Sequence, residues 1–87
     1  MRTYSKVTGS LLRKRRKELM MSQEQVMKSL GWKGKNAQQL SNCELGKNPI
    51  PVKHINNIAL VLKLNRSLIL DSMVEDFKRC LELEVNK

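Results

Sequence analysis

The sequence is poor in the residues that most catalytic and metal-binding sites use. Its 87 residues include one histidine and two cysteines, Cys43 and Cys80, which are too far apart for metal-ligand spacing. It contains no glycine-rich phosphate loop and no convergent set of acid, base and nucleophile side chains. We therefore expect no enzymatic activity, no bound metal, no cofactor and no small-molecule ligand.

Aromatic residues and long apolar runs are also scarce. Three aromatic residues are too few for a platform on which the bases of a single strand stack. The N-terminus lacks the apolar run of a signal peptide, and no segment approaches the length that spans a membrane. With both thiols expected to be reduced, these absences predict a cytoplasmic protein that does not bind a membrane.

Positive charge is abundant and unevenly distributed. The formal net charge is +9, and residues 1–53 carry all of this excess, with 12 Lys/Arg against three acidic residues. Residues 54–87 carry five residues of each sign. A basic surface binds phosphates because neutralising them releases condensed counterions. The pattern therefore favours a nucleic-acid partner over the alternative, a surface that only keeps the protein in solution.

The length suffices for one compact domain, and the apolar periodicity predicts that residues 1–87 form a single all-α domain of five helices. Pro49 and Pro51 interrupt the helical pattern, and Pro51 suits the first turn of the helix that follows. Asn65 is a suitable N-cap for the last helix. The expected helices are Val7 to about Met20, Ser22–Leu30, Asn36–Leu45, a fourth helix with Pro51 in its first turn, and a fifth from about Arg66 to Val85. In the fourth helix the side chains expected to face the core are Val52, Ile55, Ile58, Ala59 and Leu62.

The second and third helices carry their own start and stop signals. Ser22 with Gln25 three residues later forms the pattern of a capping box, and Asn36 with Gln39 repeats it. Each helix is followed by a glycine that suits a left-handed C-terminal residue, and these are Gly31 and Gly46.

The last helix has more apolar residues than one small core should need. They recur at helical spacing and are Leu70, Met73, Val74, Phe77 and Leu81. We interpret this set as a dimer contact, because an apolar stripe that continues past a compact domain usually covers a neighbouring helix. The alternative is a long helix that folds back onto its own core.

Four short motifs follow one another in a specific order and spacing. They are Ser-Gln-Glu from Ser22, Leu-Gly from Leu30, Leu-Ser-Asn-x-Glu-x-Gly-Lys from Leu40 and Ile-Ala-x-x-Leu from Ile58. In this combination the sequence resembles the lambda-repressor-like, or XRE/Cro-type, DNA-binding domain of phage and bacterial regulators. The resemblance covers about residues 7–72. It implies a five-helix fold with a helix-turn-helix, whose third helix enters the major groove.

The resemblance also implies roles for individual residues. Gln38, Gln39 and Asn42 would read base edges, since an amide can pair bidentately with N6 and N7 of adenine; Gln39 could instead cap the start of its own helix. Arg16 and Glu44 would pair between the first and third helices and hold the reading helix in place. The residues that would contact the DNA backbone are Gln23, Lys33, Lys35, Asn36, Lys47 and Asn48.

The sequence departs from the family pattern at three places. The segment between the second and third helices is about three residues longer than the usual turn. Arg15 occupies a position that is usually apolar, so we expect either that the first helix packs slightly differently or that the Arg15 side chain extends along the surface towards solvent. Met20 replaces the usual glycine after the first helix, which leaves no residue suited to a left-handed cap.

These observations predict a sequence-specific regulator of transcription that binds a double-stranded DNA operator. We expect a homodimeric repressor that controls a nearby promoter, as in a small autoregulator of a phage or mobile element. An antitoxin is the main alternative, in which the last helix would cover a toxin while the domain represses their operon. A weaker alternative is a basic protein that packs RNA or DNA without sequence preference.

Overall fold

A computed structural model describes residues 5–31 and 37–85 of the chain. This part forms five α-helices and one short 3₁₀ helix: α1 (Lys6–Glu18), α2 (Gln23–Leu30), α3 (Ala37–Glu44), η1 (Val52–His54), α4 (Ile55–Val61) and α5 (Arg66–Val85). The prediction of an all-α domain with a long C-terminal helix is confirmed. None of the helices in these two ranges combines the length and the hydropathy that crossing a membrane requires.

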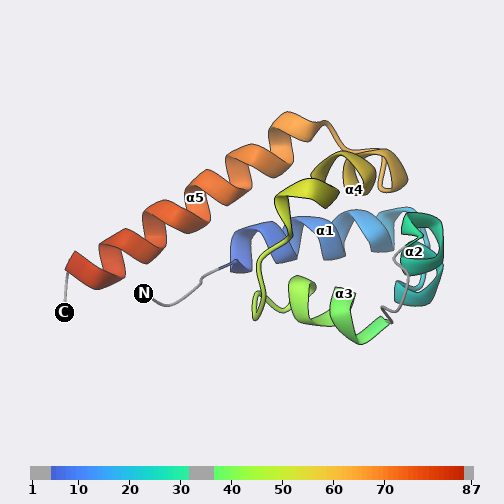
Figure 1. The fold of residues 1–87 in the computed structure, drawn as a ribbon, viewed down its shortest axis with the longest axis horizontal. Helices are drawn as coiled ribbons and strands as arrows, with labels where there is room; N and C mark the ends of the chain where they lie inside the picture. The colour runs from blue at the N-terminus through green and yellow to red at the C-terminus, as the bar shows by residue number, and fades with distance from the viewer. Residues whose placement is uncertain (1–4, 32–36, 86–87) are drawn as a thin grey trace.

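The helices are arranged around α1, which runs through the middle of the molecule (Figure 1). α3 lies on one side of α1, while α4 and α5 lie on the other. α2 lies near the end of α1 and packs against α3 and α4. α5 is the longest helix, and its C-terminal part extends past the remaining helices (Figure 1). α3 therefore occupies an outer side of the domain, away from α5.

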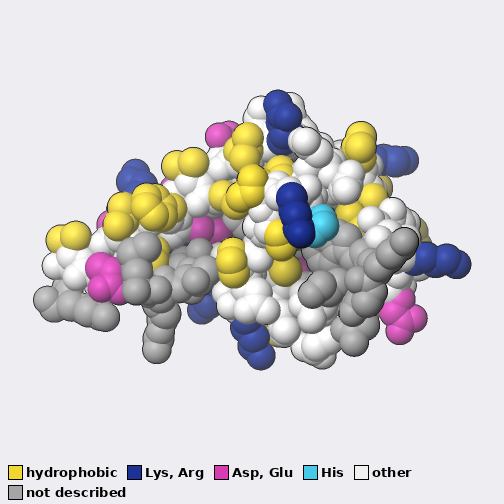
Figure 2. Space-filling model, in the orientation of Figure 1, with side chains coloured by type: hydrophobic (Ala, Val, Ile, Leu, Met, Phe, Trp, Pro, Cys, Tyr) yellow, Lys and Arg dark blue, Asp and Glu magenta, His cyan; other side chains and the backbone are white. Residues whose placement is uncertain are grey.

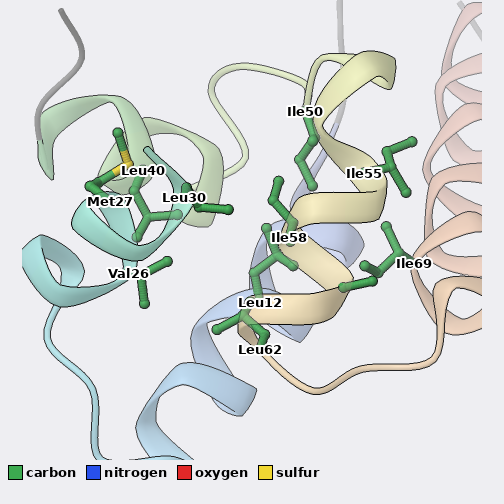
Figure 3. Packing of buried hydrophobic residues seen from close by; sticks show 11 residues of the cluster. Leu12, Val26, Met27, Leu30, Leu40, Ile50, Ile55, Ile58, Leu62 and Ile69 are labelled. Carbon is green, nitrogen blue, oxygen red and sulfur yellow. The ribbon is translucent and has the colours of Figure 1, made fainter. Parts of the chain in front are cut away.

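One apolar cluster holds these helices together (Figure 3). Its most buried side chains are at most 2% exposed and come from every α-helix of the described residues: Leu12, Val26, Leu40, Ile58, Leu62 and Ile69. Ile50, which precedes η1, adds a further buried side chain (Figure 3). Because each helix contributes at least one of these residues, the position of every helix depends on the same core.

The predicted ends of α2 are confirmed. Ser22 Oγ accepts a hydrogen bond from the Gln25 backbone N–H at 3.1 Å, and Gln25 Oε1 accepts one from the Ser22 backbone N–H at 2.7 Å. Gly31 closes the helix with a φ of 66°, and Gly46 follows α3 with a φ of 78°. Asn36, expected to cap α3, lies outside the described residues.

The end of α1 corrects the expectation about Met20. This residue has a φ of 58°, and its backbone N–H donates to Lys17 O at 3.0 Å. The Met21 N–H donates to Arg16 O at 3.1 Å, which completes the paired hydrogen bonds of a Schellman motif. A methionine thus occupies the left-handed cap position, and its side chain avoids local crowding by being 90% exposed.

We expect Met20→Gly to raise the free energy of unfolding by about 0.5–1 kcal/mol. Glycine removes the cost of a left-handed conformation, roughly 1–2 kcal/mol for other residues, and part of that gain is offset by the greater freedom of glycine in the unfolded chain. Urea denaturation of both proteins measures the difference. Lys17→Gly is the matched control, because glycine in this exposed part of α1 should lower stability by about 1 kcal/mol. Equal losses from both substitutions would contradict the role of Met20 as a cap.

The fourth helix starts later than the sequence predicts. Pro51 has an extended backbone, with φ −59° and ψ 132°, and a 3₁₀ turn follows before α4 begins at Ile55. The tighter 3₁₀ turn rotates Val52 away from the core, and its side chain is 78% exposed. The expectation that Val52 faces the core is therefore wrong, whereas the other four side chains predicted there are buried: Ile55, Ile58, Ala59 and Leu62.

α5 begins and ends where the sequence predicts. Asn65 Oδ1 accepts a hydrogen bond from the Ser67 backbone N–H at 2.9 Å, so the expected N-cap is confirmed. The face of α5 that packs against the domain carries four buried residues: Ile69, Ser72, Asp76 and Cys80. Two of these are polar, which the apolar periodicity did not indicate.

Candidate nucleic-acid interface

α3 has one buried side and one exposed side. Leu40, Cys43 and Glu44 are buried against the domain, while Gln38 and Gln39 are exposed and Asn42 is partly exposed. The Gln38 Nε2 donates a hydrogen bond to Asn42 Oδ1 at 3.0 Å. The two amides, one turn apart, are therefore joined on the outer surface of α3.

The backbone of α3 approaches α1 very closely. A Cβ atom added to Gly9 would lie 2.4 Å from Cys43 O and 2.6 Å from Glu44 O. Because these are backbone atoms, no side-chain movement can make room for a larger residue. Gly9 therefore allows the contact that sets the position of α3 on α1.

Arg16 and Glu44 join the same two helices through their side chains. Arg16 Nε lies 2.7 Å from Glu44 Oε2, and Arg16 Nη2 lies 3.0 Å from Glu44 Oε1. The side chains are only 11% and 3% exposed. Arg16 Nη1 also donates to Met21 O at 2.9 Å. This bidentate ion pair fixes the rotation of α3 about its axis, and with it the outward direction of Gln38 and Asn42.

Gln23, which the resemblance assigns to a phosphate contact, makes a hydrogen bond within the protein. Its Nε2 donates to Glu44 Oε1 at 3.1 Å, and the side chain is partly buried. The side chain thus joins the first residue of α2 to the Arg16–Glu44 pair. The Nε2 thus has an acceptor within the protein, and the phosphate contact of Gln23 stays a prediction.

The other residues assigned to the DNA backbone fall into two groups. Lys47 and Asn48 follow Gly46 at the end of α3, and both are exposed. Lys33, Lys35 and Asn36 lie outside the described residues. Of the six residues assigned to phosphate, the structure thus brings Lys47 and Asn48 to the surface beside α3 and turns Gln23 towards the interior.

Cys43 is buried next to the ion pair. Burial, and then the negative charge of Glu44, raises the pKa of the Cys43 thiol above its ordinary value. The thiol therefore stays protonated at neutral pH and packs as a small apolar group, as the sequence predicts. Cys80 is also a buried free thiol. In residues 5–31 and 37–85 no three His, Cys, Asp or Glu side chains gather as a metal site requires.

Arg15 has a role that the sequence analysis missed. Its Nε donates to Leu62 O at 3.0 Å, and its Nη2 donates to Lys63 O at 3.4 Å. These carbonyls lie at the C-terminal end of α4, where a cation also interacts favourably with the helix dipole. Arg15 therefore caps α4 instead of extending into solvent, and it joins α1 to the turn before α5.

Asp76 is a second residue that the sequence analysis missed. Its carboxylate accepts hydrogen bonds from Val7 N at 2.8 Å, Thr8 N at 3.0 Å and Thr8 Oγ1 at 2.6 Å. Ser5, the N-cap residue of α1, makes no side-chain capping bond. Asp76 thus caps α1 from α5. Asp76 is seven residues after Ile69 and four before Cys80, so the three share the buried face of the helix. A carboxylate on that face could have indicated a buried partner.

The five residues predicted as a dimer contact do not share one environment. Four of them are large exposed side chains, between 43% and 66% exposed, and they are Leu70, Val74, Phe77 and Leu81. Met73 instead packs partly against the domain core. The structure thus leaves a row of four apolar residues on the outside of α5.

Comparison with known protein families finds no match to this chain, and comparison with curated proteins finds none either.

Proposed function

We propose that this protein is a sequence-specific, double-stranded DNA-binding regulator that acts as a homodimeric repressor, with α3 as the reading helix. The observation that carries this proposal is the linked pair of outward amides, Gln38 and Asn42, on a helix fixed from behind by Arg16 and Glu44. Base reading needs such a rigid presentation, because a reader must keep its hydrogen-bond geometry while the protein docks.

Three further features support the proposal. The excess positive charge of the chain lies in residues 1–53, which include α3 and both of its supporting helices. Lys47 and Asn48 lie exposed beside the end of α3, where phosphate contacts would set the register of the helix. Amide side chains match the donor and acceptor pattern of adenine in the major groove.

In a two-fold symmetric dimer bound to DNA, the operator would be a palindrome with half-sites about one helical turn apart.

We expect Gln38→Ala to weaken binding to the preferred duplex by about 1–3 kcal/mol while sparing binding to random duplex. The preferred sequence is selected from a random DNA pool with the wild-type protein, and affinities are then measured by fluorescence anisotropy at fixed salt. Asn57→Ala, which removes an exposed amide on α4, is the control and should bind like wild type. An equal loss on preferred and random duplexes would remove Gln38 from the base readers, and a pool that yields no preferred sequence would contradict the proposal as a whole.

A further inference from the structure

The exposed side of α5 carries an ordered apolar row. Leu70, Val74, Phe77 and Leu81 follow one another at intervals of four, three and four residues, which is the spacing of a coiled-coil seam. At 100° per residue, the row lies about 125° around the helix from the buried face that packs on the domain. Figure 2 shows apolar side chains gathered along α5 on one face of the molecule. The seam therefore points away from the domain, and a second helix can approach it without meeting α1.

Two charged residues of opposite sign lie along one edge of this seam. Asp71 follows Leu70 and Lys78 follows Phe77, seven residues apart, so both occupy the same edge. Both are exposed, and this edge lies on the side of the seam away from the domain. The other edge is occupied by Met73, which packs partly against the core.

The order of these charges suits a second copy of the same helix running in the opposite direction. In an antiparallel pair, equivalent edges of the two helices meet, so Asp71 of each copy lies opposite Lys78 of the other. The same arrangement places Leu70 of one copy against Leu81 of the other and Val74 against Phe77. A parallel pair would instead place this edge of one helix against the opposite edge of the other, where Asp71 would approach Arg66 but Lys78 would face Met73. Only the antiparallel pair gives both charges an opposite partner.

We propose that α5 binds α5 of a second copy of this chain in antiparallel orientation, about a two-fold axis between Val74 and Phe77. Two Asp71–Lys78 contacts, one at each end, would set the register. The inference deepens the homodimeric part of the proposed function and rests on it only there, because the pairing requires nothing of α3. Self-complementary charge is the reason to assign the seam to a second copy instead of a different protein.

Sedimentation equilibrium of the full chain without DNA tests the pairing. We expect wild type to dimerise, and Asp71→Lys and Lys78→Asp each to weaken dimerisation about 10-fold, because each places two like-charge contacts in the pair. An equimolar mixture of the two variants should recover wild-type affinity, since the mixed pair contains only opposite charges. Lys28→Glu changes an exposed charge on α2 and should dimerise like wild type. Circular dichroism checks that every variant keeps its helices.

The outcomes separate this inference from the rest of the proposed function. Recovery in the mixture supports the antiparallel pair, because positions 71 and 78 do not face each other in a parallel pair, and combining the two variants there would not restore wild-type affinity. Variants that dimerise like wild type, or a mixture that stays as weak as its components, would overturn the orientation. A wild-type chain that remains monomeric would overturn the assignment to a second copy and leave the seam to a different protein. None of these results alters the test of Gln38 on DNA, which depends on α3.

Discussion

Replacing Glu44 with alanine is expected to lower the free energy of unfolding by about 3–5 kcal/mol, since removing one partner of a buried ion pair leaves the other charge without compensation. Arg16 would lose both of its contacts to the carboxylate, and Gln23 would lose the acceptor of its Nε2. A domain of this length has a total stability of about 4–13 kcal/mol. The substitution should therefore move the urea midpoint by a large fraction of its wild-type value.

The exposed Glu75–Arg79 pair on α5 provides a matched control. Its N–O distance is 3.1 Å, but its side chains are 45% and 51% exposed. Glu75→Ala should cost no more than about 0.5 kcal/mol, because solvent screens an exposed pair. If the two alanine variants lost similar stability, burial would not be the reason for the strength of the Arg16–Glu44 pair.

The Glu44→Ala substitution also connects stability with the proposed reading of bases. The carboxylate holds α3 against α1 and α2, while Gln38 and Asn42 are on the opposite side of the same helix. Under conditions where the variant remains folded, we expect a loosened α3 to discriminate less between preferred and random duplexes. If Glu44→Ala discriminated between preferred and random duplexes as well as wild type does, the Arg16–Glu44 pair would stabilise the fold without orienting the reading helix.

Asp76→Ala is expected to lower the free energy of unfolding by about 2–4 kcal/mol, because two backbone N–H groups and one hydroxyl lose their acceptor in a buried site. The loss should be concentrated at the start of α1. Amide hydrogen exchange should therefore accelerate at Val7 and Thr8 more than at residues in the middle of the helix. Urea denaturation measures the total effect, and exchange locates it.

Two further variants of α5 sharpen the Asp76 test. Asp76→Asn keeps one carbonyl acceptor and removes the charge, so its loss should lie between those of wild type and Asp76→Ala. Glu82→Ala removes an exposed carboxylate from the same helix and should change the exchange at Val7 and Thr8 very little. Unchanged protection of these two amides in Asp76→Ala would contradict the assignment of Asp76 as the cap of α1.

Local sequence signals predicted the helices accurately where the signal and its effect lie within one turn. The capping box of Ser22 and Gln25, the left-handed Gly31 and the Asn65 cap all involve residues no more than four positions apart. The period of 3.6 residues also placed Gln38 opposite the buried Leu40 and Glu44. These features depend on the backbone geometry of a single helix, and the amino-acid sequence states them directly.

The sequence was less informative at the end of α1 and at the start of α4, where the chain can adopt more than one backbone conformation. The preference of glycine for a left-handed conformation argues against Met20 as the C-terminal cap of α1. The paired hydrogen bonds of the Schellman motif nevertheless hold methionine in that conformation. Val52 matched the helical period, but the chain after Pro51 first forms a 3₁₀ turn and turns Val52 outward.

The amino-acid sequence by itself determined the number and extent of most helices, several of their caps, the uneven charge, and the shared face of Gln38 and Asn42 on α3. Only the tertiary structure decided that Asp76 caps α1 from 68 residues away, that Arg15 caps α4, that Gln23 turns to Glu44 and that Gly9 fits beneath α3. The physical reason is that each of these contacts joins two helices. Their partners are set by how the helices pack around the shared core, and no spacing along the chain specifies that packing.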